Sequence, residues 1–180
     1  TCSDCGSAEF SYKEMMMKLE VLPLNQHTFS AYGDVIETDK RDFFHINDAH
    51  TERYHALVQT ESDATGKIGI SIFRNIKTTT LPLQIDMLER HPIGSQAFIP
   101  MQGQKFLIVV APNLNAEQPD LQRIRAFMSD GTQGVNYRAG TWHHPLLTLE
   151  SPSDFAVVDR LGTGHNCDVF RFPESVLIQE

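Results

Sequence analysis

The chain has 180 residues, of which 41% are hydrophobic and 21% are charged, a balance that is ordinary for one globular domain with a buried core. Its formal net charge of -8 makes nucleic acid a poor partner, because an acidic surface repels phosphate groups. The longest apolar runs are far shorter than the ~20 residues that a membrane-spanning helix needs, so we expect no membrane segment.

The first residues differ in composition from those that follow. Thr1–Met15 is small and polar and holds two of the three cysteines, and the pattern changes after the methionines at 15–17. We predict that residues 1–16 derive from an expression vector and that residues 17–180 form a single domain. Three cysteines at scattered positions do not make a disulfide framework, so we expect a protein of the reducing cytoplasm.

The predicted elements that follow are mostly short strands. Leu19–Leu24 is predicted as a strand, Asn25 as the cap of a short helix or turn, and the polar, His-rich segment Asp39–Arg53 as a long loop. Later strands recur between turns rich in Gly, Pro, Asn and Asp, with a modest helical alternative at Asp120–Arg125. They are Ile68–Phe73, Leu81–Leu88, Gln96–Ile99, Phe106–Val110, Ile124–Phe127, Gly134–Tyr137, Leu146–Leu149, Phe155–Asp159 and Val169–Phe172. This spacing is typical of a β sandwich or barrel.

Polar side chains alternate along two neighbouring predicted strands. Glu89 and His91 lie two residues apart, so in a strand both face the same side, and Gln96 and Phe98 do the same on the next strand. A hairpin of these strands would direct a carboxylate, an imidazole and an amide into one interior. The alternative is a surface hairpin whose polar face meets water.

A second candidate segment surrounds the single tryptophan, Trp142. The adjacent His143 and His144 face opposite sides of an extended chain, so at most one of them enters a shared pocket, and the sequence leaves open which. Imidazole carries protons near neutral pH and binds metals, so one of the two could join His91 and Glu89 in a metal site. The alternative is that the histidines are packed and inert.

Other side chains are weaker candidates for substrate contacts. Arg74 ends a predicted strand, where its guanidinium could hold a carboxylate through two hydrogen bonds. Lys105 precedes an apolar strand and is a candidate residue of a pocket mouth. Tyr137 and Trp142 flank the histidine segment. For the two cations, the alternative is a solvated surface charge.

Several motifs are distinctive in combination. They are Leu-Glu-Arg-His-Pro at 88–92, Gln-Ala-Phe-Ile-Pro-Met at 96–101, Gly-Val-Asn-Tyr at 134–137, Trp-His-His-Pro-Leu at 142–146 and Asn-Cys-Asp at 166–168. With them, the chain resembles the bacterial ureidoglycolate lyases of allantoin breakdown, formerly called ureidoglycolate hydrolases. The resemblance covers nearly everything from Met17 onward and is weakest at Thr51–Lys67 and at Arg138–Thr141.

The resemblance implies a mainly β, cupin-like double-stranded β-barrel of jelly-roll type with few short helices, usually as a homodimer. It implies release of glyoxylate and urea from (S)-ureidoglycolate in purine catabolism, and a divalent metal, with nickel as the candidate. Two other classes stay open: a cupin-like binding protein for a small carboxylic acid, and a metal-dependent oxygenase or isomerase on the same barrel.

The implied reaction assigns roles to the candidate residues. A base removes the hydroxyl proton of the substrate, a carbonyl forms, the C–N bond breaks, and an acid protonates the departing urea nitrogen. We expect either that His91 and His143 are the base and the acid, or that both hold a metal together with Glu89. Gln96 is expected to bind the ureido group.

Overall fold

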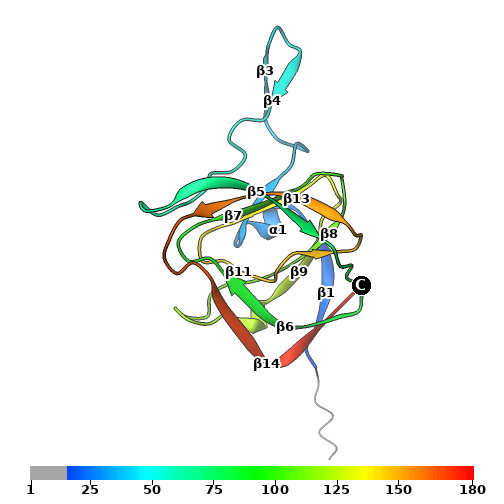
Figure 1. Cartoon of the computed structure of the whole chain (residues 1–180). Helices are drawn as coiled ribbons and strands as arrows, with labels where there is room; N and C mark the ends of the chain where they lie inside the picture. The colour runs from blue at the N-terminus through cyan, green and yellow to red at the C-terminus, as the bar shows by residue number, and fades with distance from the viewer. Residues whose placement is uncertain (1–15) are drawn as a thin grey trace, which may run out of the picture.

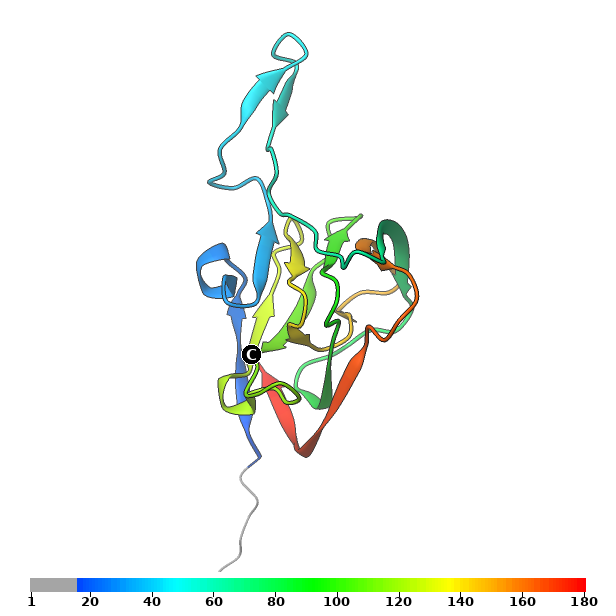
Figure 2. The same cartoon turned by 90° about the vertical axis from the view of Figure 1, so that its left-hand side faces the viewer.

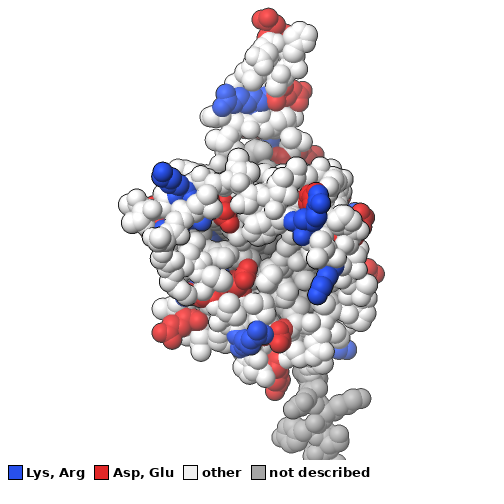
Figure 3. Space-filling model, viewed as in Figure 1, with Lys and Arg blue, Asp and Glu red and all other residues white. Residues whose placement is uncertain are grey.

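The computed structural model describes residues 16–180, which form two large β-sheets and a separate two-stranded hairpin (Figure 1). Apart from Met16, the segment predicted to derive from a vector lies outside the described residues. No helix in this part of the chain is long and apolar enough to cross a membrane. On the face drawn in Figure 3, the Lys and Arg side chains lie scattered among Asp and Glu.

The larger sheet closes on itself. Its strands are β1 (Lys18–Pro23), β6 (Leu83–Arg90), β8 (Phe106–Ala111), β9 (Arg125–Met128), β11 (Trp142–His143), β12 (Leu147–Thr148) and β14 (Asp168–Gln179). Because β11 pairs with both β6 and β8, six of these strands form a ring in the order β11-β6-β14-β1-β9-β8. β1 is parallel to both of its neighbours, and the other pairs are antiparallel, so the ring is a mixed barrel.

The second large sheet has the order β2-β10-β7-β13-β5 and covers one wall of the ring. Its strands are β2 (Gly33–Ile36), β5 (Lys67–Asn75), β7 (Gln96–Pro100), β10 (Gly134–Tyr137) and β13 (Ser153–Leu161). One apolar core joins Phe98 and Phe155 of this sheet to Phe106 and Phe127 of the ring, and a second core fills the ring itself. β8 separates the two cores, and all six of its residues are therefore buried.

Helical structure is limited to two short segments. The α-helix α1 (Gln26–Phe29) follows Asn25, whose side chain accepts a hydrogen bond from the Thr28 N–H at 3.0 Å, as expected for a helix cap. A single 3₁₀ turn, η1 (Leu121–Arg123), replaces the helical alternative at Asp120–Arg125, since β9 already begins at Arg125. The prediction of a mainly β, cupin-like barrel with few short helices is confirmed.

The segment predicted as a long loop contains a hairpin that projects from the barrel (Figure 2). Its strands are β3 (Phe44–Ile46) and β4 (Thr51–Arg53), and Asn47 and Asp48 in its turn adopt φ values of 54° and 53°. Asn and Asp enter this left-handed region more readily than other residues with side chains. The loop prediction was wrong because neither strand has a buried face, so the sequence carries no apolar alternation there.

The predicted hairpin of Glu89–His91 with Gln96–Phe98 is also wrong in its pairing. β6 belongs to the ring and β7 to the five-stranded sheet. Both edges of β6 are occupied by β11 and β14, and both edges of β7 by β10 and β13, so neither strand has an edge free for the other. The chain crosses between the sheets, and the polar side chains still converge on one cavity.

A buried ion pair ties a loop to the outer face of β13. Arg160 is 7% exposed, and its Nε lies 2.5 Å from Asp63 Oδ1, while its Nη2 donates to the carbonyl oxygen of Thr163 at 2.9 Å. The chain turn at Gly94 packs against the same side chain, and a Cβ there would lie 2.6 Å from the Arg160 Cβ. Position 94 therefore requires glycine, because the Arg160 side chain leaves no room for a Cβ.

We expect Asp63→Asn to lower the melting temperature near neutral pH, because it leaves a buried guanidinium without its carboxylate. The hydrogen bond from Arg160 lowers the pKa of Asp63 from 3.8 to about 2. The contribution of Asp63 is therefore complete above about pH 4 and is lost as the pH falls toward 2, so the variant should approach the wild type there. Thermal melts followed by circular dichroism across this range test the prediction.

Asp86→Asn is the matched control, since Asp86 makes only an exposed pair with Arg171 at 3.5 Å and such pairs contribute little. A difference between Asp63→Asn and the wild type that stays constant from neutral pH to acid would contradict the assignment.

Candidate active site

A cavity of about 510 Å³ opens between the ring and the five-stranded sheet. Three of its lining strands are β5, with Phe73, Arg74 and Asn75, β6, with Glu89, and β7, with Gln96 and Phe98. His91, Pro145 and Leu146 complete the lining from the connecting segments. One part of this wall is apolar, and the other offers charged and amide groups. Such a mixture is typical of sites for small ligands.

Three groups that can bind a metal or carry a proton cluster here: Glu89 and His91 line the cavity, and His143 is buried beside them. His143 lies opposite Glu89 in the β11–β6 pair, and its Nε2 is 3.7 Å from Glu89 Oε1. His91 Nε2 is 4.0 Å from the same oxygen, and the two imidazole centres are 5.3 Å apart. The strand pairing thus joins residues that are more than fifty positions apart in the chain.

Backbone carbonyl groups orient both imidazoles. His91 Nδ1 lies 2.6 Å from the Asn166 carbonyl oxygen, and His143 Nδ1 lies 2.9 Å from that of Thr141. A carbonyl oxygen only accepts, so each Nδ1 carries a hydrogen, and the neutral form of each imidazole keeps its lone pair on Nε2. Neither Nε2 has a hydrogen-bond partner among the described residues, although both atoms are buried.

This donor set fits a divalent cation. The ligand atoms of Glu89, His91 and His143 all lie within 4.8 Å of one another, and both imidazoles already present a lone pair. Imidazole nitrogens with a carboxylate oxygen suit zinc, nickel and iron, and ligating histidines commonly donate their other N–H to a carbonyl group.

Burial sets the protonation of the site. It lowers the pKa of His143 to about 3 and raises the pKa of Glu89. Tyr137 stacks on His143 with ring centres 4.2 Å apart and an angle of 10°, and it helps to exclude water from that imidazole. His143 is therefore neutral near neutral pH, and its contact with Glu89 is not an ion pair there.

The structure decides between the two adjacent histidines. His143 is 1% exposed and faces Glu89, whereas the His144 ring lies 2.9 Å from the carbonyl oxygen of Pro145, away from the pair. Trp142 also faces away: it packs in the core of the ring, with the Arg90 guanidinium 4.5 Å above its indole. The alternation of the short strand explains both results, and Trp142 is not brought to the cavity.

Of the remaining residues predicted to contact substrate, two line this cavity and two do not. Gln96 and Arg74 line the cavity, but the Arg74 guanidinium is held by Asp154 through contacts of 2.7 and 2.8 Å. Tyr137 lies behind His143. Lys105 lines a different cavity, at the start of β8, whereas the other end of that strand pairs with His143. The structure therefore does not bring Lys105 to this site.

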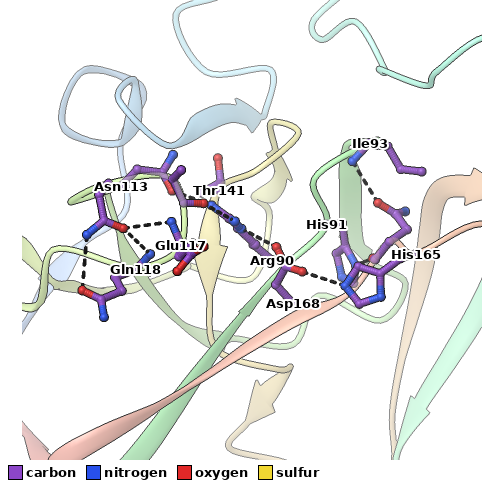
Figure 4. Close-up of polar contacts among 12 residues, drawn as sticks. Arg90, His91, Ile93, Asn113, Glu117, Gln118, Thr141, His165 and Asp168 are labelled. Atoms are coloured by element: carbon purple, nitrogen blue, oxygen red, sulfur yellow. Dashed lines mark hydrogen bonds and ion pairs between the residues drawn. The ribbon is translucent and has the colours of Figure 1, made fainter.

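Sequence reasoning missed the segment that supports His91 (Figure 4). Asn166 accepts from the His91 ring through its carbonyl oxygen, and its side-chain oxygen accepts from the Ile93 N–H at 3.0 Å. Asp168 binds Arg90 Nε at 2.8 Å and His165 Nε2 at 2.7 Å. The segment is thus attached to the chain on both sides of His91. The only signal in the sequence was the Asn-Cys-Asp motif at 166–168.

The fold and the site define a class: a cupin-like β-barrel with two buried imidazole nitrogens and a carboxyl group clustered at a small cavity between its sheets. The family model for ureidoglycolate lyase matches residues 16–179. A ureidoglycolate lyase of Escherichia coli O1:K1 is 54% identical over 161 residues, which span 89% of this chain and 98% of that protein. One of Salmonella paratyphi B is 53% identical over 157 residues, or 87% and 96% of the two chains. The chain belongs to the ureidoglycolate lyase family, as the motifs predicted.

We expect Asn166→Ala to reduce turnover or metal affinity by ~10–100-fold, the usual effect of losing a group that orients a ligating or catalytic histidine. The change removes the acceptor of the Ile93 N–H and frees the carbonyl group that orients His91. Steady-state kinetics and a calorimetric nickel titration measure the two effects. His165→Ala, in the same segment but exposed, is the control and should differ little from the wild type. Equal behaviour of both variants would refute this role for Asn166.

Proposed function

We propose that this chain is an enzyme that cleaves (S)-ureidoglycolate into glyoxylate and urea, the reaction for which its family is named. The observation that carries the proposal is the cluster of His91, His143 and Glu89, from separate segments, at a cavity whose wall includes His91 and Glu89. The substrate bears a hydroxyl, a carboxylate and a ureido group on one carbon. Each of these groups has a candidate partner in the cavity wall.

The protonation of the site supports a division of the proton transfers. His91 Nε2 has a lone pair at the cavity and is suited to take the hydroxyl proton as the carbonyl forms. The raised pKa of Glu89 suits this carboxyl to deliver a proton to the nitrogen of the departing urea. His143, neutral near pH 7, orients the hydroxyl by accepting a hydrogen bond but is not an acid. This differs from the expected scheme in which both histidines transfer protons.

The same groups favour a second arrangement, because two buried Nε2 atoms without partners point at one carboxylate. We propose Glu89, His91 and His143 as the ligands of a divalent cation, with nickel as the candidate. Such an ion, when bound, would lower the pKa of the substrate hydroxyl. In both arrangements Gln96 binds the ureido group, and Arg74 lies where it can attract the carboxylate.

We expect purified wild-type protein to release urea from ureidoglycolate, and His91→Ala to lower kcat by ~10²–10⁴-fold. His143→Ala should also lower kcat, because it removes the group that orients the hydroxyl or holds the cation. His27→Ala, on the surface helix α1, is the matched control. Loss of activity with a chelator and recovery with nickel would support the metal arrangement. Activity that a chelator does not change would support the proton-transfer arrangement. Absence of urea release by the wild type would reject the function, and oxygen uptake would favour an oxygenase.

We also propose that the enzyme is a homodimer that packs through the outer face of the five-stranded sheet. Ile70 and Ile72 on the edge strand β5 are 78% and 62% exposed, and their cross-strand neighbours on this face are Val158 and Ala156. A contiguous apolar face on a protein surface is typical of an interaction site. The same face on a second copy can cover it through a two-fold axis.

Replacing Ile70 with Asp is expected to convert the dimer to a monomer, because it buries a charge in the proposed interface. Light scattering coupled to size-exclusion chromatography measures the mass. Leu114→Asp is the control, since Leu114 is also exposed but lies in a loop away from this face. A monomeric wild type at micromolar concentration would contradict the proposal.

We further propose that residues 17–180 act as one catalytic domain in the cytoplasm, in allantoin and purine breakdown. The shared core of the ring and the five-stranded sheet supports a single domain. Within the described residues the one cysteine, Cys167, is unpaired and exposed, which fits a reducing compartment.

A further inference from the structure

We propose that Asp159 is a positioning residue that turns the Gln96 side-chain amide, so that the amide oxygen faces the cavity and selects ligands with N–H groups. The inference rests on the proposed function and names the group that distinguishes ureidoglycolate from other small hydroxy acids. In the sequence, Asp159 is only the last residue of the predicted strand Phe155–Asp159.

Strand pairing sets Asp159 beside Gln96. The two residues are directly opposite in the β13–β7 pair and face the interior between the two sheets. Gln96 is 7% exposed, lines the cavity, and donates through Nε2 to Asp159 Oδ2 at 3.3 Å. Arg160, the next residue, faces the opposite side and is bound by Asp63 there, so it does not neutralise Asp159 through direct contact.

The chemistry of this pair fixes the orientation of the amide. A carboxylate only accepts hydrogen bonds, so Gln96 must turn its NH₂ group toward Asp159 and its Oε1 away from it. Among the described residues, Gln96 Oε1 has no hydrogen-bond partner although it is buried, and the same is true of Asp159 Oδ1. Buried acceptors without donors are costly, so the cavity wall at Gln96 is adapted to a ligand that donates.

A ureido group supplies the missing donors. It carries N–H groups on both nitrogens, whereas the rest of ureidoglycolate offers one hydroxyl donor and an accepting carboxylate. His91 and Glu89 lie elsewhere in the same cavity wall, where they can meet the hydroxyl and the carbon–nitrogen bond. The Gln96–Asp159 pair would thus recognise the leaving group, and the imidazole–carboxyl group would carry out the proton transfers.

Two probes separate these functions: ureidoacetate, which is the substrate without its hydroxyl, and glycolate, which lacks the ureido group. In Asp159→Asn the new amide can donate, so the Gln96 amide can turn over and present its NH₂ group to the cavity. We expect the affinity for ureidoacetate, measured by calorimetry on the full-length protein, to fall ~10-fold or more. The affinity for glycolate should stay within about two-fold of the wild type, and Asp86→Asn should change neither value.

A second variant shows whether Asp159 acts through Gln96. Gln96→Leu removes the acceptor and should weaken ureidoacetate binding selectively, and adding Asp159→Asn to it should have little further effect. Equal losses for both probes, or an undiminished effect of Asp159→Asn in the Gln96→Leu protein, would overturn the inference. If Asp159→Asn does not fold, the test uses Gln96→Leu alone. A loss of ureidoacetate affinity with unchanged glycolate affinity supports the inference, and equal losses contradict it.

The two proposals can fail separately. Urea release by the wild type, together with unchanged ureidoacetate binding by Asp159→Asn, would end this inference and leave the proposed function intact. In the opposite case, the wild type releases no urea but binds ureidoacetate more tightly than glycolate, and Asp159→Asn removes that preference. This result would contradict only the proposed function. With ureidoglycolate as substrate, Asp159→Asn should raise KM more than it lowers kcat.

Discussion

The pairing of β11 with β6 is the constraint on which the rest of the structure depends. This two-residue strand closes the ring, and the same register sets His143 opposite Glu89. Closure and site formation are therefore one event: a slip of one residue would turn Trp142 toward the cavity and His143 into the apolar core. The fully buried environment that lowers the pKa of His143 follows from the same closure.

Strand alternation separates chemistry from support throughout the site. On β6, Glu89 faces the cavity, and the next residue, Arg90, faces the other way to stack on Trp142 and bind Asp168. On β13, Asp159 faces inward while Arg160 holds a loop on the outer face. Glu89 and Asp159 are thus each followed by a charged residue that is anchored on the opposite side of the strand, which limits their freedom to move.

Unpartnered acceptors lie in the cavity wall, on His91 and Gln96, and on the residues that contact them. Two Nε2 lone pairs, the Gln96 amide oxygen and one Asp159 oxygen are buried without donors among the described residues. A small ligand with a hydroxyl and several N–H groups satisfies such a wall, as does a cation on its imidazole side.

The sequence by itself determined most strand positions outside the β3–β4 hairpin, the cap at Asn25 and the shared direction of Glu89 and His91, because period-two alternation and capping depend only on neighbouring residues. Only the tertiary structure decided that β6 and β7 join different sheets, that His143 faces inward, and that Lys105 lies at another cavity. It also placed Asn166 beside His91 and Asp159 beside Gln96. These outcomes depend on which strand edges are free and which distant segments meet there, and no local pattern encodes that.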